Sequence, residues 1–93
     1  MDESEKPTEV VFYEQAQVLE HQGEYEAAIM VLQDAIAFNP GIAAIHNRLG
    51  VLIGIHRGDF VAGAEHVAKA MDLEPDNEHY RNNHEKMIHR AAH

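Results

Sequence analysis

The chain has 93 residues, of which 45% are hydrophobic and 25% charged, and it contains no cysteine. This composition fits one small globular domain, and it excludes a disulfide framework and any metal site built on thiolates. The formal net charge of −9 and the lack of a long apolar run argue against nucleic acid and membranes as partners.

The acidic residues are concentrated in the first half of the chain. Nine acids precede Arg48 against the single base Lys6, whereas seven acids and six bases follow from Arg48 onward. The opening stretch MDESEKPTEV is unlike a secretory signal, so a cytoplasmic location is the default expectation. Residues 1–8 are charged, contain Pro7 and lack periodicity, which predicts a flexible arm.

Two helices are predicted after this arm. Apolar residues recur at helical spacing over residues 9–22 and again over residues 24–38. Gly23 separates the two helices, because glycine tolerates the positive φ with which many helices end. Pro40 closes the second helix, since proline cannot continue a helix and disfavours helical angles in the residue before it.

The same pattern then restarts, with predicted helices over residues 42–56 and 59–73, separated by Gly58 and closed by Pro75. A last amphipathic helix is predicted over residues 78–93. Its apolar face is expected to comprise Tyr80, His84, Met87, Ile88 and Ala91. The sequence therefore predicts an all-α fold of five helices, arranged as two antiparallel hairpins and a closing helix.

Two stretches of the chain repeat each other. Residues 23–40 (GEYEAAIMVLQDAIAFNP) and 58–75 (GDFVAGAEHVAKAMDLEP) align without a gap, 35 residues apart. Small residues are expected where the axes of paired helices approach closely, namely at Ala16, Ala28, Ala35, Gly50, Gly63 and Ala70. Tyr25 and Phe60, two residues after the turn glycines, are expected to fold over the hairpin ends.

These residues resemble the tetratricopeptide repeat (TPR), a helix–turn–helix unit of about 34 residues with the pattern W-x2-L-G-x2-Y, A-x3-F and P. The resemblance implies a first repeat at residues 9–42, a second at residues 43–77 and a capping helix at residues 78–93. The matched positions are Phe12, Ala16, Leu19, Gly23, Ala28, Leu32, Ala35 and Pro40 in the first repeat, and Leu49, Gly50, Ile53, Gly58, Gly63, Val67, Ala70 and Pro75 in the second.

The chain departs from the family pattern at three places. Gln15 stands where the first repeat would have leucine, and His46 replaces the leading aromatic residue of the second repeat. The spacing from Gly50 to Gly58 is one residue too long, which predicts an insertion in the second hairpin turn near Arg57. These departures concern the local helix ends rather than the fold.

The resemblance implies a right-handed solenoid whose concave surface is lined by the first helix of each hairpin. It implies an adaptor, chaperone-like or assembly factor that binds a peptide or helix of another protein, with apolar anchors and a basic flank. Alternatively, Val51 and Ile55 simply meet the next helix of the stack. The expected partner-binding residues are Val10, Tyr13, Gln17, Glu20, His21, Ala44, Asn47, Val51, Gly54, Ile55, Asn82, Asn83 and Lys86.

The alternative function is self-assembly, in which two copies bury the apolar groove or the open end of the stack against each other, because two repeats lie near the lower limit for a stable solenoid. The acidic chaperone tails that some relatives bind are disfavoured as ligands, since this chain is itself negative and has Tyr13 and Gln17 where the first repeat would supply clamp residues.

No enzyme activity, cofactor or metal site is predicted. His84 and His89 lie five residues apart, whereas the H-E-x-x-H zinc motif needs its histidines four apart on one helix face. His89 and His93 have the right spacing but no obvious third ligand. Ser4 and Thr8, the only serine and threonine, both lie in the predicted arm, which argues against a nucleophilic triad.

Overall fold

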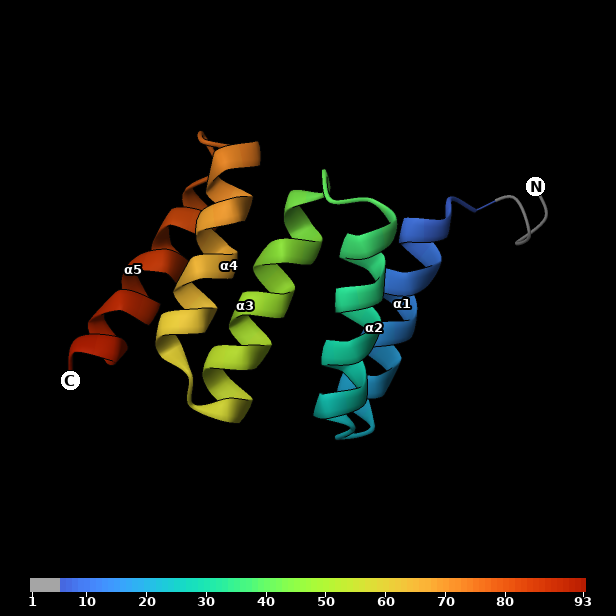
Figure 1. The fold of residues 1–93 in the computed structure, drawn as a ribbon, viewed down its shortest axis with the longest axis horizontal. Coiled ribbons are helices and arrows are strands. Elements are labelled where there is room, and N and C mark those ends of the chain that lie inside the picture. The colour runs from blue at the N-terminus through green and yellow to red at the C-terminus, as the bar shows by residue number, and fades with distance from the viewer. Residues whose placement is uncertain (1–5) are drawn as a thin grey trace.

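The computed structural model describes residues 6–93, which form five α-helices and, within that range, no β-strand (Figure 1). The helices are α1 (Thr8–His21), α2 (Tyr25–Phe38), α3 (Ala43–Arg57), α4 (Phe60–Leu73) and α5 (Glu78–Ala92). Each end lies within one residue of the sequence prediction. Residues 1–5 of the predicted arm fall outside the described residues, and Thr8 belongs to α1.

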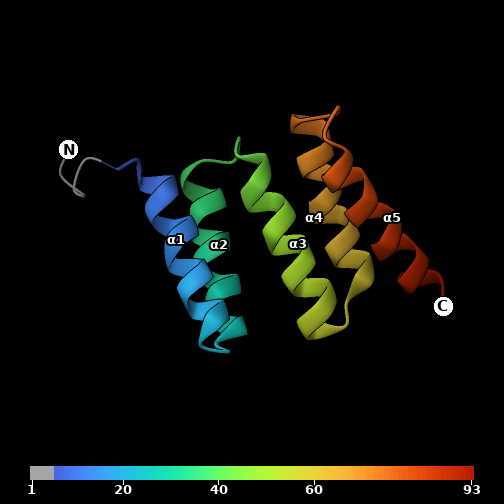
Figure 2. The same cartoon turned by 180° about the vertical axis from the view of Figure 1, so that it is seen from behind.

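The helices stand side by side in an elongated row, with principal extents of 47 × 30 × 19 Å. Consecutive helices are antiparallel, so that α1 with α2 and α3 with α4 form two hairpins, and α5 follows (Figure 1). Figure 2 shows α1 and α5 at opposite ends of the row. The predicted fold class, two antiparallel hairpins and a closing helix, is confirmed.

Glycine and proline set the helix ends at the expected positions. Gly23 has φ +78° and Gly58 has φ +68°, in the left-handed region that favours glycine. Pro40 and Pro75 each follow the last residue of a helix by two positions. Asn77 caps α5, since its side chain accepts a hydrogen bond of 3.2 Å from the Tyr80 backbone N–H.

The prediction of an insertion in the second hairpin turn is wrong. α3 stays helical as far as Arg57 and has 15 residues, one more than α1. Gly58 and Asp59 then connect α3 to α4, whereas three residues connect α1 to α2. The additional residue is therefore absorbed as helix. This is possible because Gly58 ends α3 directly and Asp59 caps α4, accepting a bond of 3.0 Å from the Ala62 N–H.

The closest helix pair is α3 with α4, where two glycines face each other. A Cβ atom on Gly50 would lie 2.5 Å from the Gly63 carbonyl oxygen, and one on Gly63 would lie 2.7 Å from the Gly50 carbonyl oxygen. Only glycine permits this approach of two backbones. The larger core cluster joins the first hairpin to α3 and consists of Ala16, Ala28, Ile29, Leu32, Ala35, Ile45, Leu49, Leu52 and Ile53.

A buried histidine ties α3 to the connection before it. His46 Nε2 donates a hydrogen bond of 2.8 Å to the Pro40 carbonyl, and its buried Nδ1 has no hydrogen-bond partner among residues 6–93. His66 on α4 is partly buried near His46. Burial, and secondarily the proximity of His46 and Lys69, lower the pKa of His66, while Glu65 acts in the opposite direction.

Stability is expected to fall as the pH is lowered from about 7.5 to about 5.5. The unfolded chain takes up a proton at His66 near its ordinary pKa of 6.5, whereas folded His66, whose pKa is lowered, takes it up only at a lower pH. The unfolded state therefore binds more protons in this window, so the free energy of unfolding decreases as the pH falls. Urea unfolding at each pH measures the free energy of unfolding. This free energy should decrease less in the His66→Gln variant than in the wild type. An equal decrease in both proteins would exclude His66 as the source.

Candidate functional site: three clefts on one face

Three clefts lie between the first helices of the hairpins and the closing helix. Two of them separate α1 from α3, and the third separates α3 from α5. These three helices are the first, third and fifth of an antiparallel row, so they run in the same direction. The clefts thus follow one another across a single face, although each has a different chemical character.

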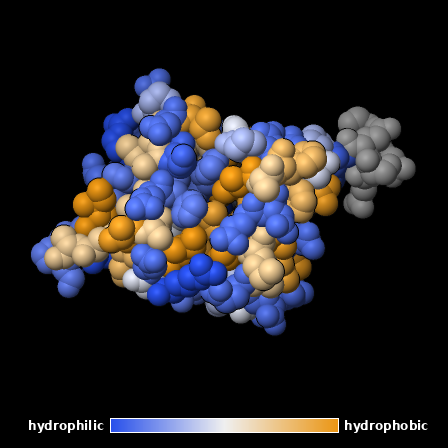
Figure 3. Space-filling view, in the orientation of Figure 1, coloured by the Kyte–Doolittle hydropathy of each residue, from blue (hydrophilic) through white to orange (hydrophobic). Residues whose placement is uncertain are grey.

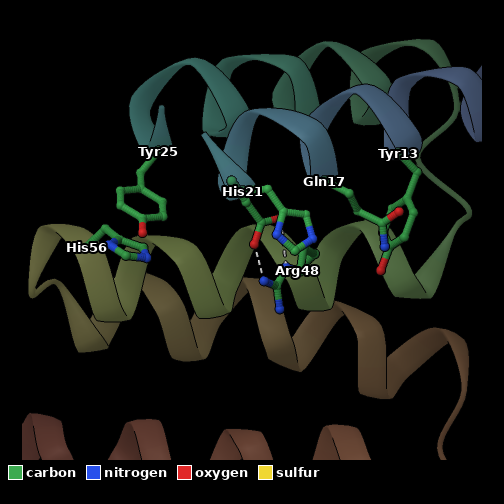
Figure 4. A pocket seen from close by; sticks show the side chains of 7 residues that line it. Tyr13, Gln17, His21, Tyr25, Arg48 and His56 are labelled. Atoms are coloured by element: carbon green, nitrogen blue, oxygen red, sulfur yellow. Dashed lines mark hydrogen bonds and ion pairs between the residues drawn. The ribbon is translucent and has the colours of Figure 1, made fainter. Parts of the chain in front are cut away.

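The largest of these clefts is polar, with a volume of about 460 Å³. Tyr13, Gln17 and His21 project into it from α1 toward α3 (Figure 4). Its wall contains an ion pair between Glu20 and Arg48, in which Arg48 Nε donates to a Glu20 carboxylate oxygen at 3.0 Å. The hydrogen bond to Glu20 raises the pKa of the Arg48 guanidinium, which stabilises the charged form of Arg48 in this pair.

Aromatic stacking closes one end of the polar cleft. The Tyr25 ring lies over the His56 ring with centroids 3.5 Å apart and an interplanar angle of 13° (Figure 4). Next to this stack, Arg57 binds the Glu26 carboxylate, with the shortest N–O distance at 2.6 Å. The hydrogen bond from Arg57 holds the pKa of Glu26 below its usual value. These contacts fasten the end of α3 to the start of α2.

The second cleft between α1 and α3 is apolar and measures about 200 Å³. It adjoins the polar cleft, because Tyr13 lines both. Its other walls are Glu9, Val10, Ile42, Ala44 and Ile45. A single carboxylate, Glu9, therefore stands at the border of an otherwise apolar or aromatic surface, which suits an aliphatic or aromatic side chain of a ligand.

The third cleft, between α3 and α5, combines apolar residues with two cations. It measures about 240 Å³ and is lined by Val51, Ile55, Asn83, Lys86, Met87 and Arg90. Asn83 Nδ2 donates to Asn47 Oδ1 at 3.0 Å and so joins the two helices beside the cleft. The Arg90 guanidinium lies 5.6 Å from the centroid of the Phe60 ring, where the ring face attracts a cation.

Ten of the thirteen residues expected to bind a partner line one of these clefts. The other three differ. Asn47 is buried in its bond to Asn83, and Asn82 is exposed on α5 outside the three clefts. Gly54 is buried because α5 packs directly on it, so that a Cβ atom there would lie 2.5 Å from Met87 Sδ. Gly54 thus positions α5 rather than facing a ligand.

Sequence reasoning left Arg48, Tyr25 and His56 out of the site, although all three line the polar cleft. Arg48 carried a usable signal, since it lies four residues after Ala44 and three before Val51, on the same helical stripe. No sequence pattern indicated that Tyr25 and His56 belong to the site, because their contact depends on how the end of α3 meets the start of α2.

The apolar face predicted for α5 is only half buried. Tyr80 and Met87 are buried, but Ile88 and Ala91 are exposed beside a groove of about 500 Å³ on the outer side of α4 and α5. The face is therefore divided: Tyr80 and Met87 pack toward α3 and α4, while Ile88 and Ala91 lie beside this groove. Figure 3 shows apolar residues in separate patches among polar ones on the visible face, including near the α4–α5 end.

Within residues 6–93, no three His, Asp or Glu side chains gather in a way that could hold a metal ion. None of the helices described is long and apolar enough to cross a membrane. A scan against models of known protein families finds none that matches the chain, and a search of curated proteins finds no similar sequence.

Proposed function

We propose that the chain is a TPR domain of two repeats and a capping helix, acting as a protein-interaction module of the adaptor, chaperone-like or assembly-factor kind in the cytoplasm. The observation that carries this proposal is the succession of three clefts across the face of α1, α3 and α5. A surface made from parallel helices with alternating apolar and polar hollows suits a polypeptide segment better than one compact small molecule.

The clefts indicate the chemistry of the partner segment. An apolar side chain fits the cleft around Val10 and Ala44, and hydrogen-bonding groups fit the polar cleft beside Gln17. A second apolar side chain fits beside Val51, where Lys86 favours a neighbouring acid. Glu20 is engaged by Arg48, so a basic flank of the partner would find its acidic complement at Glu9 instead.

Val51→Glu is expected to weaken the binding of a peptide to the three clefts by about tenfold or more, because it places a carboxylate where an apolar side chain of the peptide docks. Peptides selected on the wild type from a display library supply the ligand, and fluorescence polarisation measures affinity. Met30→Glu is the matched control, since Met30 is 63% exposed on α2 and lines none of the three clefts.

Light scattering on the same two variants separates this function from self-assembly through the groove. If Val51→Glu left peptide affinity unchanged, the face of α1, α3 and α5 would not be the binding surface. If Val51→Glu instead converted a wild-type dimer into a monomer of 10.5 kDa, a second copy of the chain would occupy the clefts.

A further inference from the structure

The lysine and arginine side chains of this acidic chain differ in whether a carboxylate neutralises them. Three of the seven form ion pairs, namely Lys6 with Glu14, Arg48 with Glu20 and Arg57 with Glu26. The other four, Lys69, Arg81, Lys86 and Arg90, form no ion pair with any group of residues 6–93. Of these four, Lys86 and Arg90 line the third cleft, between α3 and α5, whereas Lys69 and Arg81 line none of the three.

The two cations of the third cleft lie close together on α5. Lys86 and Arg90 are four residues apart, so they are neighbours on one face of the helix. The Arg90 guanidinium lies 5.6 Å from the centroid of the Phe60 ring, and this attraction helps to hold it in place. Both side chains are exposed, so an incoming group can reach them without a change in the helix packing.

The three clefts differ in the sign of their charge. Among the residues that line the third cleft, the charged ones are Lys86 and Arg90, and both are positive. The polar cleft contains Arg48 together with its counterion Glu20, and the apolar cleft between α1 and α3 contains Glu9. Although the whole chain has a formal charge of −9, the third cleft is therefore the part of this face that favours an anionic group.

Apolar surface lies beside these two cations. Ile55 is 55% exposed and, with Val51, lines the same cleft, while Met87 is buried between them and α5. An apolar side chain can therefore cover Ile55 while a neighbouring carboxylate reaches the cations. A carboxylate has two oxygens that accept hydrogen bonds, so one group can bind Lys86 and Arg90 together.

We propose that the third cleft binds an acidic side chain, Asp or Glu, of the partner segment, held by Lys86 and Arg90 next to an apolar residue that covers Ile55. This inference rests on the proposed function, because it specifies the partner of the same face. A basic residue of the segment fits instead at Glu9, on the α1 side. Charge thus determines which end of the segment lies over α5.

Reversing one charge of the cleft tests this assignment. The probes are the peptides selected on the wild type from a display library, synthesised with an amidated C-terminus so that only side chains supply carboxylates. Lys86→Glu should weaken their binding about fivefold or more, because an attraction becomes a repulsion. Lys69→Glu is the matched control and should stay within about twofold of the wild type. It makes the same change at an exposed position of α4 that lines none of the three clefts.

Reversing the charge of the peptide as well distinguishes direct contact from a structural role of Lys86. Each acidic residue of a selected peptide is replaced by lysine in turn. One such replacement should weaken binding to the wild type and strengthen binding to Lys86→Glu, by about threefold or more in each case. A role of Lys86 within α5 alone, such as interaction of its charge with the end of the helix, would not be compensated by a change in the peptide.

Val51→Glu distinguishes failure of this assignment from failure of the proposed function. If Val51→Glu weakens peptide binding but Lys86→Glu behaves like Lys69→Glu, the acidic contact is wrong and the proposed binding face stands. If neither Val51→Glu nor Lys86→Glu weakens binding, both proposals are wrong. Selected peptides that contain no Asp or Glu would also overturn the acidic contact.

Discussion

Gly50→Ala is expected to lower the free energy of unfolding by about 2 kcal/mol, although alanine is intrinsically the better helix former. The added Cβ atom would lie 2.5 Å from the Gly63 carbonyl oxygen and 2.8 Å from Val67 Cγ2. The nearest atom belongs to the backbone, so it cannot move without separating α3 from α4. These two helices share the most extensive packing in the molecule.

Gly41→Ala is the control for this substitution. Gly41 lies in the connection between α2 and α3, and its nearest neighbour to an added Cβ would be Asn39 Oδ1 at an ordinary 3.4 Å. We expect a change within about 1 kcal/mol, since loss of glycine also restricts the unfolded chain. Urea unfolding followed by circular dichroism compares both variants. Equal stability of the two would show that α3 and α4 do not need the close approach.

Leu32→Ala is expected to cost about 3 kcal/mol of unfolding free energy, the second large effect. Leu32 is fully buried in α2, within the cluster that joins the first hairpin to α3. Truncation removes apolar contacts and leaves a cavity that the surrounding helices fill only in part. Because a domain of this size has a modest total stability, such a loss should be visible as a large fall in the melting temperature.

Leu73→Ala makes the same chemical change at an exposed position. Leu73 ends α4 and is 43% exposed, so the substitution should cost less than about 1 kcal/mol. The difference between the two leucines measures how far the buried cluster, rather than helix propensity, holds the hairpins together. Similar losses at both positions would contradict the assignment of Leu32 to the core.

The helices could be predicted from the sequence because their ends depend on local chemistry. Gly23 and Gly58 take the positive φ that ends a helix, and Pro40 and Pro75 stop the helices before them. The repetition between residues 23–40 and 58–75 then indicated two hairpins of the same kind. Each of these signals lies within a few residues of the feature that it predicts.

The site could be predicted only in part, because it depends on how helices meet. Periodicity shows which residues share a helix face, but it does not say which neighbour that face contacts. Gly54 therefore appeared to face the clefts, although it packs against Met87. The ion pair of Glu20 with Arg48 joins residues far apart in the chain and had no local signal.

Chemical-shift mapping would show whether a partner segment binds on the face of α1, α3 and α5. A 15N-labelled sample is titrated with a peptide selected from the display library, and the backbone amides that move are placed on the structure. The amides that move are expected to cluster around the three clefts, near Tyr13, Gln17, Val51 and Lys86. Movement confined to the outer faces of α2 and α4, away from these clefts, would contradict it.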